Sequence, residues 1–187
     1  MAFMLGDRPI QPLTVDQAMQ MVEAGIIPED NRLELLHGML TEKTVKSPEH
    51  SVLKSRLAKW LRQADAYDVR IEDALRVADD TSLPEPDIAV VEHDDHLQQH
   101  PYGASLVIEV AKTSPKIDTQ IKPPLYAGAG IPDYWVVDVD ARRVIVHRNP
   151  TADGYASVTS HGHTGTLQPL VVDAEPLDLE ALFDGLR

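Results

Sequence analysis

The fold of this chain is decided by three strings of residues: PDIAVVE (Pro86–Glu92), SLVIEVA (Ser105–Ala111) and KIDTQIK (Lys116–Lys122). The first two strings are short, apolar and rich in β-branched residues, as expected for strands that are buried on both faces of a sheet. Each of them nevertheless contains a carboxylate, Asp87 in the first strand and Glu109 in the second. A buried carboxylate must be paired, hydrogen-bonded or bound to a cation, because an isolated buried charge is costly.

Two helices are predicted on the N-terminal side of these strands. Thr14 and Gln17 have the spacing of a capping box, and Gly25 is typical of the residue that follows a helix end. Ser47 and Pro48 are typical of an N-cap and a first helical position, and they predict a second helix that extends to about residue 66. Between the two helices, residues 32–45 predict a hairpin around a glycine turn.

Short strands are predicted in much of the remaining chain, over residues 69–77, 134–139, 144–148, 155–159 and 167–172. A helix is predicted to start or kink at Pro123-Pro124, and another to cover residues 177–186. The sum is an α/β fold, with a mixed sheet flanked by a few helices. For 187 residues we expect a single domain over 1–187, with an N-terminal helix at 14–25, a core at 32–148 and C-terminal strands and a helix at 155–187.

Composition restricts the classes of partner. The chain has 17 basic and 30 acidic residues and a net charge of −13, which is a poor electrostatic footprint for nucleic acid. It has no run of about 18 apolar residues, so we expect no membrane span, and its first residues lack the pattern of a secretory signal. The absence of cysteine excludes disulfides and thiolate metal sites, and it fits a cytoplasmic protein.

The two strand acids and a nearby lysine are the groups needed to hold a divalent cation and cut a phosphodiester. Carboxylates on neighbouring strands would raise each other's pKa unless a cation lay between them. Mg²⁺ suits such a pair, since it takes one or two carboxylates together with water and phosphate oxygens. The alternative is that Asp87 and Glu109 lie at strand ends in solvent or pair with Lys or Arg, and spacing alone leaves both interpretations open.

Strand periodicity decides which lysine belongs with Glu109. Residues two apart share a face of a strand, so a lysine partner is expected at position 111, which is Ala111 in this chain. Lys112 points to the opposite face, and it fits an ordinary solvated lysine. Lys122, on the following helix, is long enough to reach the site and is therefore the predicted lysine.

One long string carries a family resemblance: EVAKTSPKIDTQIKPPLYAGAGIPDYWVVD (Glu109–Asp138). Together with PDIAVV before it and RLELLHG earlier, it resembles the Uma-type family of restriction endonucleases in the PD-(D/E)xK nuclease superfamily. The resemblance extends from about residue 13 to about residue 148. It implies a restriction-endonuclease-like fold, cleavage of nucleic acid that depends on Mg²⁺ (or Mn²⁺), DNA as the substrate, and a homodimer.

The resemblance also assigns roles to residues. It implies that Asp87 and Glu109 bind the metal and that Lys122 is a displaced catalytic lysine. It further implies that Glu34 is an additional acid near the site and that His50, a candidate proton carrier by residue type, lies close by. His50 is equally well explained as an ordinary histidine in the first turn of a helix.

The chain departs from the family pattern at two places. His37 stands where the family has an aspartate before glycine, and Pro123-Pro124 constrains the segment that presents Lys122. Two functions therefore stay open, a metal-dependent endonuclease and a catalytically inactive nuclease-fold module for binding or assembly. The net charge and the alanine at position 111 favour the module, whereas the joint presence of both acids and Lys122 favours the enzyme.

A second metal hypothesis is weaker. The histidines His93, His96 and His100 have the spacing of helical metal ligands, but they lie in a polar connection. Short patterns of this kind specify a zinc site only loosely.

Overall fold

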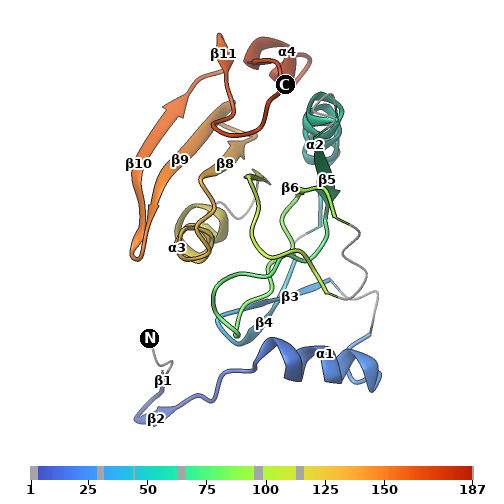
Figure 1. Cartoon of the computed structure of the whole chain (residues 1–187), viewed down its shortest axis with the longest axis vertical. Coiled ribbons are helices and arrows are strands. Elements are labelled where there is room, and N and C mark those ends of the chain that lie inside the picture. Colours follow the sequence, from blue (N-terminus) through green and yellow to red (C-terminus); the bar gives the residue numbers. More distant parts are fainter. Residues whose placement is uncertain are drawn as a thin grey trace.

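A computed structural model of the chain describes residues 4–28, 32–43, 45–62, 66–94, 99–112 and 116–186. Its centre is a six-stranded mixed sheet in the order β10-β9-β8-β7-β6-β5 (Figure 1). The strands are β5 (Tyr67–Ile71), β6 (Ile88–Glu92), β7 (Leu106–Ala111), β8 (Asp133–Asp138), β9 (Arg143–Thr151) and β10 (Gly154–His161). Within this sheet only β7 and β8 are parallel. The predicted α/β fold is confirmed.

The parallel pair explains where the next helix lies. Two parallel strands need a crossover connection, in contrast to the tight turn that joins an antiparallel pair. Here the crossover is a π-helical turn, η1 (Ile117–Ile121), followed by α3 (Lys122–Gly128). The two prolines lie in the first turn of α3, where an N–H has no intrahelical partner to lose. The predicted helix start is confirmed, and the π turn before it was not predicted.

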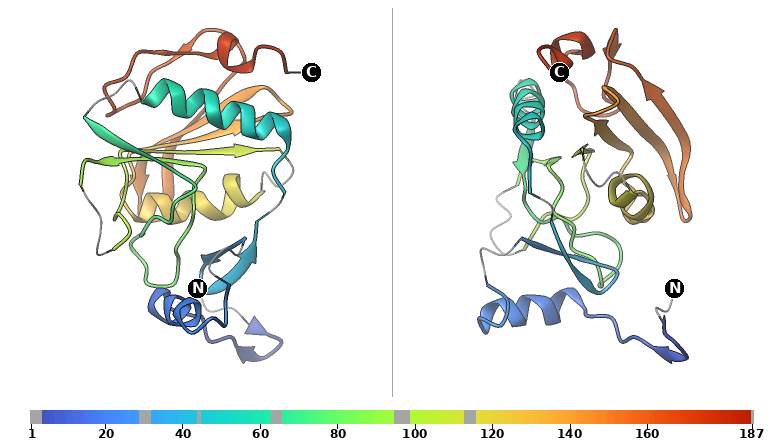
Figure 2. Two further views of the ribbon diagram at one scale, coloured as in Figure 1. Left: turned by 90° about the vertical axis from the view of Figure 1, so that its right-hand side faces the viewer. Right: turned by 180° about the vertical axis from the view of Figure 1, so that it is seen from behind.

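The sheet has a helix on each face (Figure 2). α2 (Pro48–Leu61) buries Leu53, Leu57 and Leu61 against one face, beside the short α4 (Leu179–Phe183). The α3 helix covers the other face and packs Tyr126 there. The Ser47 N-cap and the first-turn proline of α2 are confirmed, and the helix ends at Leu61, earlier than predicted.

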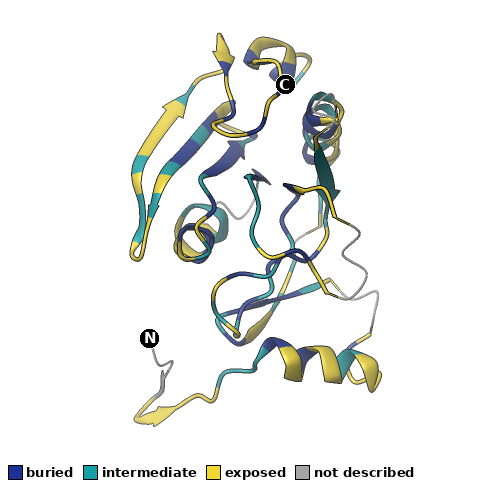
Figure 3. Cartoon of the chain, in the orientation of Figure 1, coloured by how far each residue is buried: buried dark blue, intermediate teal, exposed yellow. Residues whose placement is uncertain are grey.

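Every residue of β7 is buried, as predicted for a strand covered on both faces. Alternate residues belong to different clusters of the core: Leu106, Ile108 and Val110 pack on the α2 side, and Val107 and Ala111 on the α3 side. Because side chains alternate along a strand, Glu109 must project toward α3. Figure 3 shows how burial falls from the centre of the sheet to the largely exposed edge strand β10.

The N-terminal part lies below this sheet in Figure 1. It contains β1 (Met4–Leu5) and β2 (Arg8–Pro9), the capped helix α1 (Val15–Glu23), and the hairpin of β3 (Leu33–Leu36) and β4 (Met39–Glu42). The Thr14 capping box and the predicted hairpin are confirmed. At the hairpin turn, a Cβ on Gly38 would lie 2.2 Å from the Cβ of Pro12, so only glycine fits this position.

Hydrogen bonds donated by backbone N–H groups connect the hairpin to the segment that enters β6. Leu83 N donates to Leu35 O at 2.8 Å, and His37 N donates to the Ser82 hydroxyl at 2.9 Å. These contacts place Glu34 beside the start of β6. His37, the residue that departs from the family pattern, lies in this turn with a φ of 51°.

Besides the earlier end of α2, three predicted elements differ from the structure. The strand over 69–77 ends at Ile71, because Glu72 has a φ of 57° and turns the chain out of extended conformation. The strand over 167–172 is reduced to β11 (Thr166–Leu167), which pairs with β12 (Leu177–Asp178). The terminal helix is shortened to α4, because Asp178 caps it and Leu177 belongs to β12.

Across the described part of the chain, no helix is long and apolar enough to cross a membrane.

Candidate active site

The two strand acids lie side by side. Ile88 of β6 is opposite Ile108 of β7, so in this antiparallel pair Asp87 is opposite Glu109. Asp87 N donates to Glu109 Oε2 at 3.3 Å, and Val110 N donates to Asp87 Oδ2 at 2.8 Å. Both side chains are buried. The predicted neighbouring strands therefore bring the two carboxylates together.

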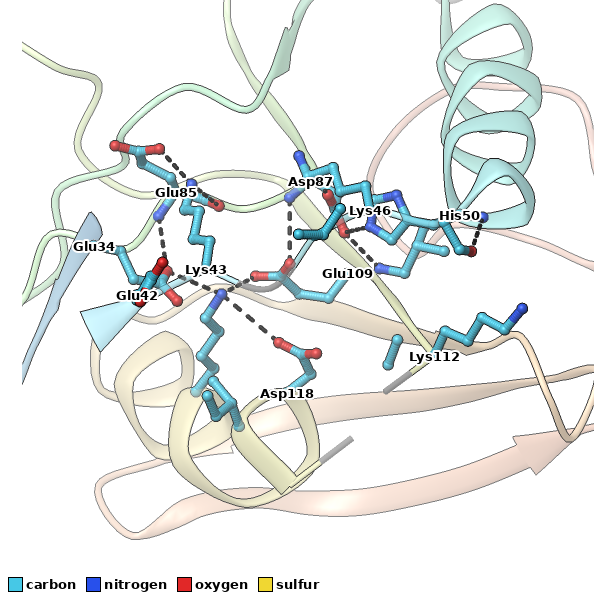
Figure 4. Close-up of a pocket in the computed structure, with 16 residues that line it drawn as sticks. Glu34, Glu42, Lys43, Lys46, His50, Glu85, Asp87, Glu109, Lys112 and Asp118 are labelled. Carbon is cyan, nitrogen blue, oxygen red and sulfur yellow. Dashed lines mark hydrogen bonds and ion pairs between the residues drawn. The ribbon is translucent and has the colours of Figure 1, made fainter. Parts of the chain in front are cut away.

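Lys122, the first residue of α3, joins them, and Figure 4 shows Glu34, Glu109 and Asp118 around this position. Its Nζ lies 2.8 Å from Glu109 Oε1 and 3.1 Å from Glu34 Oε2, and the side chain is only 5% exposed. Lys112 points elsewhere, to Glu49 at 3.0 Å, as strand periodicity predicts. The lysine beside the two acids is thus the one that the sequence indicates.

His50 and Glu34 complete the set of predicted site residues. His50, in the first turn of α2, has its Nε2 3.0 Å from Asp87 Oδ2. Glu34, on β3, uses Oε2 to accept a hydrogen bond from Glu85 N at 3.4 Å while it contacts Lys122. All five predicted residues line one pocket, which is also lined by further charged side chains: Glu42, Lys43, Lys46, Glu85, Lys112 and Asp118.

Two residues near the site were not in the predicted set. Asp118 lies one helical turn before Lys122, with its Oδ1 3.7 Å from the Lys122 Nζ. Tyr126 lies one turn after Lys122 and donates its hydroxyl proton to Glu109 Oε1 at 3.0 Å. Residues four apart lie on one face of a helix, so this spacing around Lys122 is the signal that could have identified both.

The acids outnumber the cations at this position. Burial raises the pKa of Glu109 to about 8, and the carboxylates of Asp118, Asp87 and Glu34 add to the shift although Lys122 opposes it. Burial likewise raises the pKa of Asp118 to about 6 against the opposing charge of Lys122. The site therefore carries carboxylates whose charge one lysine does not fully compensate.

For two other groups, the neighbouring charges and hydrogen bonds outweigh the effect of burial on the pKa. Burial alone would lower the pKa of Lys122, but Glu109, Glu34 and Asp118 outweigh it and raise that pKa, so Lys122 stays protonated. Burial would raise the pKa of Asp87, but the contact with His50 and the hydrogen bond from Val110 outweigh it and lower that pKa. Asp87 is therefore ionised at neutral pH.

The donor set fits a hard divalent cation. Carboxylate oxygens are what Mg²⁺ prefers, and a bound cation would offset the excess of negative charge. Among the described residues, no group of three or more His, Cys, Asp or Glu side chains is arranged to hold a metal ion. A cation here would thus be held by the Asp87 and Glu109 carboxylates, with its other positions filled by water or substrate oxygens.

The described residues give no support to a metal site formed by His93, His96 and His100. His93 is exposed and its Nδ1 lies 2.9 Å from Asp68 Oδ1, and His100 is exposed outside any helix or strand. His96 lies outside the described residues.

A six-stranded mixed sheet that brings two acids and a lysine into one pocket defines a protein of the restriction-endonuclease-like fold class. A solved structure shares this fold: a chain described as a putative nuclease of DUF820 from Anabaena variabilis superposes with a TM-score of 0.76, covering 94% of this chain and 100% of its own at 16% identity. The model of the Uma2 family, described as "Putative restriction endonuclease", matches residues 16–180, so this chain belongs to that family. No curated protein matches.

Proposed function

We propose that this chain is an endonuclease that depends on Mg²⁺, or Mn²⁺ in its place, and hydrolyses phosphodiester bonds of nucleic acid, with DNA as the substrate. The observation that supports it is the convergence of Asp87, Glu109 and Lys122, from three separate elements, in one pocket. Membership of the Uma2 family supports the same reaction class.

Asp87 and Glu109 are the proposed metal ligands. When bound, the cation supplies Lewis-acid polarisation of a phosphate and a more acidic bound water. The chain's own contribution is to orient the two carboxylates. Backbone N–H groups fix one oxygen of each acid, since Val110 N holds Asp87 Oδ2 and Asp87 N holds Glu109 Oε2.

Lys122 is the proposed catalytic cation. Its raised pKa keeps the ammonium group charged, so it can stabilise negative charge that develops on a phosphate or orient the attacking water. Glu34 and Asp118 contact the same Nζ, at 3.1 and 3.7 Å, which restricts the position of the ammonium group. We assign both of them a positioning role.

His50 is the proposed proton carrier. Its Nε2 contacts Asp87 Oδ2, so the imidazole is held by the acid that lies closest to it. An imidazole has two ring nitrogens that can carry or accept a proton, which suits proton transfer to a leaving oxygen.

A second candidate is a catalytically inactive nuclease-fold module for binding or assembly. The observation that favours it is the net charge of −13, since non-specific affinity for nucleic acid rests on basic residues. The single domain, the cytoplasmic location and the homodimer expected from the sequence stay predictions. Light scattering after size-exclusion chromatography would test the homodimer.

The test of the proposed function is nicking of supercoiled plasmid DNA in Mg²⁺ and in EDTA. We expect nicking in Mg²⁺ that is abolished by EDTA and lost in Asp87→Ala, Glu109→Ala and Lys122→Ala. If the wild type and these variants gave the same background cleavage, the inactive module would replace the enzyme.

A further inference from the structure

Beside the proposed active site, two lysines converge on a single carboxylate oxygen. The ammonium groups of Lys46 and Lys54 both contact Oε1 of Glu72. Lys46 also lies 3.6 Å from Asp87 Oδ1, so the cluster adjoins one of the proposed metal ligands. Figure 4 shows Lys46 beside Asp87 and His50.

The convergence of the two lysines is electrostatically unfavourable without an anion between them. Lys54 is only 15% exposed, and burial followed by the charge of Lys46 lowers its pKa. An anion at this position relieves the repulsion, and in the free protein that anion is the Glu72 carboxylate.

Glu72 reaches this position in an uncommon backbone conformation. It directly follows β5 and has a φ of 57°, a region that non-glycine residues rarely adopt. Backbone strain of this kind concentrates at functional sites. The same conformation ends β5 and turns the Glu72 side chain toward the two lysines.

We propose that Lys46 and Lys54 form a subsite for a backbone phosphate of nucleic acid, and that Glu72 occupies this subsite in the free protein. A phosphodiester carries one negative charge and two free oxygens, so it can accept both ammonium groups as the carboxylate does. The contact of Lys46 with Asp87 places this phosphate next to the one that is cut. The inference rests on the proposed function for the identity of the ligand.

The same pairing of lysines with glutamates limits how strongly this acidic chain binds a polyanion. Other lysines at the pocket are paired in the same way, Lys43 with Glu85 and Lys112 with Glu49. A phosphate must therefore displace a glutamate to reach a lysine, which lowers the affinity for nucleic acid. Removal of the competing charge of Glu72 should tighten binding.

The experiment measures binding of a short fluorescein-labelled DNA duplex by anisotropy, in EDTA and at several salt concentrations. Glu72→Gln keeps the shape of the side chain and is expected to tighten binding about fivefold at low salt. Lys54→Met is expected to weaken binding and to reduce the salt slope by about one. Asp153→Asn, in the β9–β10 turn outside the pocket lining, changes the net charge equally and is expected to bind within about twofold of the wild type.

Glu72→Gln binding that matches Asp153→Asn would overturn the subsite, as would absence of duplex binding by every variant. The gain of affinity expected for Glu72→Gln tests the subsite even if Lys54→Met fails to fold. If plasmid nicking is metal-dependent but Glu72→Gln binds no tighter, the subsite is wrong and the proposed function stands. If nothing is nicked but binding follows the expected order, the subsite stands and the nuclease assignment is wrong.

Discussion

Asp133 and Glu109 are both buried acids on neighbouring strands of one sheet, yet their surroundings differ completely. Asp133 is matched by one arginine: Arg148 donates to both of its oxygens, at 2.9 and 3.1 Å. Trp135 Nε1 and Leu170 N fill the remaining acceptor positions. Glu109 instead shares Lys122 with other carboxylates, and its pKa is raised to about 8.

A buried acid in a strand therefore does not by itself indicate a catalytic or metal-binding role. Asp133 has a fully satisfied, bidentate partner, which is the arrangement of a structural ion pair. The Glu109 site holds more acids than its one lysine can neutralise, so the pKa of Glu109 is raised, and perturbed pKa values of this kind point to function. Four predictions distinguish the Glu109 site from the Asp133 ion pair, and they follow in order of decreasing effect.

The largest effect is expected at Lys122. Lys122→Met should lower the nicking rate by about 10³-fold, because it removes charge stabilisation from the reaction. Arg148→Met, the matched change at the other acid, should leave the rate per folded molecule unchanged. Initial nicking rates, corrected for the folded fraction by circular dichroism, test this. Equal losses of rate in Lys122→Met and Arg148→Met would show that the two ion pairs do not differ in their importance for catalysis.

Asp133→Ala should affect the stability of the protein and not its nicking rate per folded molecule. It removes the carboxylate that accepts from Arg148 and from the Trp135 N–H, which should lower the free energy of unfolding by about 2–3 kcal/mol. A larger loss of stability, as for a fully buried ion pair, is not expected, because the Arg148 side chain is 28% exposed and can be hydrated. Urea denaturation measures the change. An unchanged unfolding midpoint would show that Asp133 is not a structural acid.

Comparison of these two regions also shows what the sequence could reveal. The sequence places Asp87 and Glu109 in two apolar strands but leaves open whether they meet, and the pairing of Ile88 with Ile108 in the structure brings them together. Strand periodicity suffices to reject Lys112. Asp118 and Tyr126 could have been found from their spacing, since each lies four residues from Lys122, on the same face of the helical segment. The end of β5 was missed because it depends on the left-handed conformation of Glu72, which residue type does not indicate.

A smaller effect concerns pH. The folded-state pKa of Glu109, about 8, lies above its ordinary value of 4.5, so the folded protein binds more protons than the unfolded chain between these values. Stability of the metal-free protein should therefore fall as pH rises from 6 to 8, by about 1–2 kcal/mol. Urea denaturation in EDTA at each pH measures it.

Glu109→Gln serves as the control for this pH effect, since it has no group that titrates there and should flatten the dependence. Mg²⁺ should restore stability at pH 8 in the wild type and leave Glu109→Gln nearly unchanged, because metal binding competes with the proton. An equal slope in both proteins would assign the pH dependence to another group.

The smallest effect is expected at Tyr126. Tyr126→Phe removes only the hydroxyl that holds Glu109 Oε1, so the carboxylate loses one of the contacts that orient it. We expect affinity for Mg²⁺ to fall about tenfold, in the range for groups that orient a ligand. Isothermal titration calorimetry measures this. Tyr155→Phe, which loses a hydrogen bond to Ile131 O, is the matched control and should bind Mg²⁺ as the wild type does.

The central claim is that Asp87 and Glu109 share one divalent cation. Anomalous diffraction from a crystal soaked in Mn²⁺ tests it most directly. We expect one strong anomalous peak within bonding distance of a carboxylate oxygen of both Asp87 and Glu109, at the roughly 2.0–2.2 Å typical of a small divalent cation. No peak between the two acids, or a peak elsewhere alone, would contradict it.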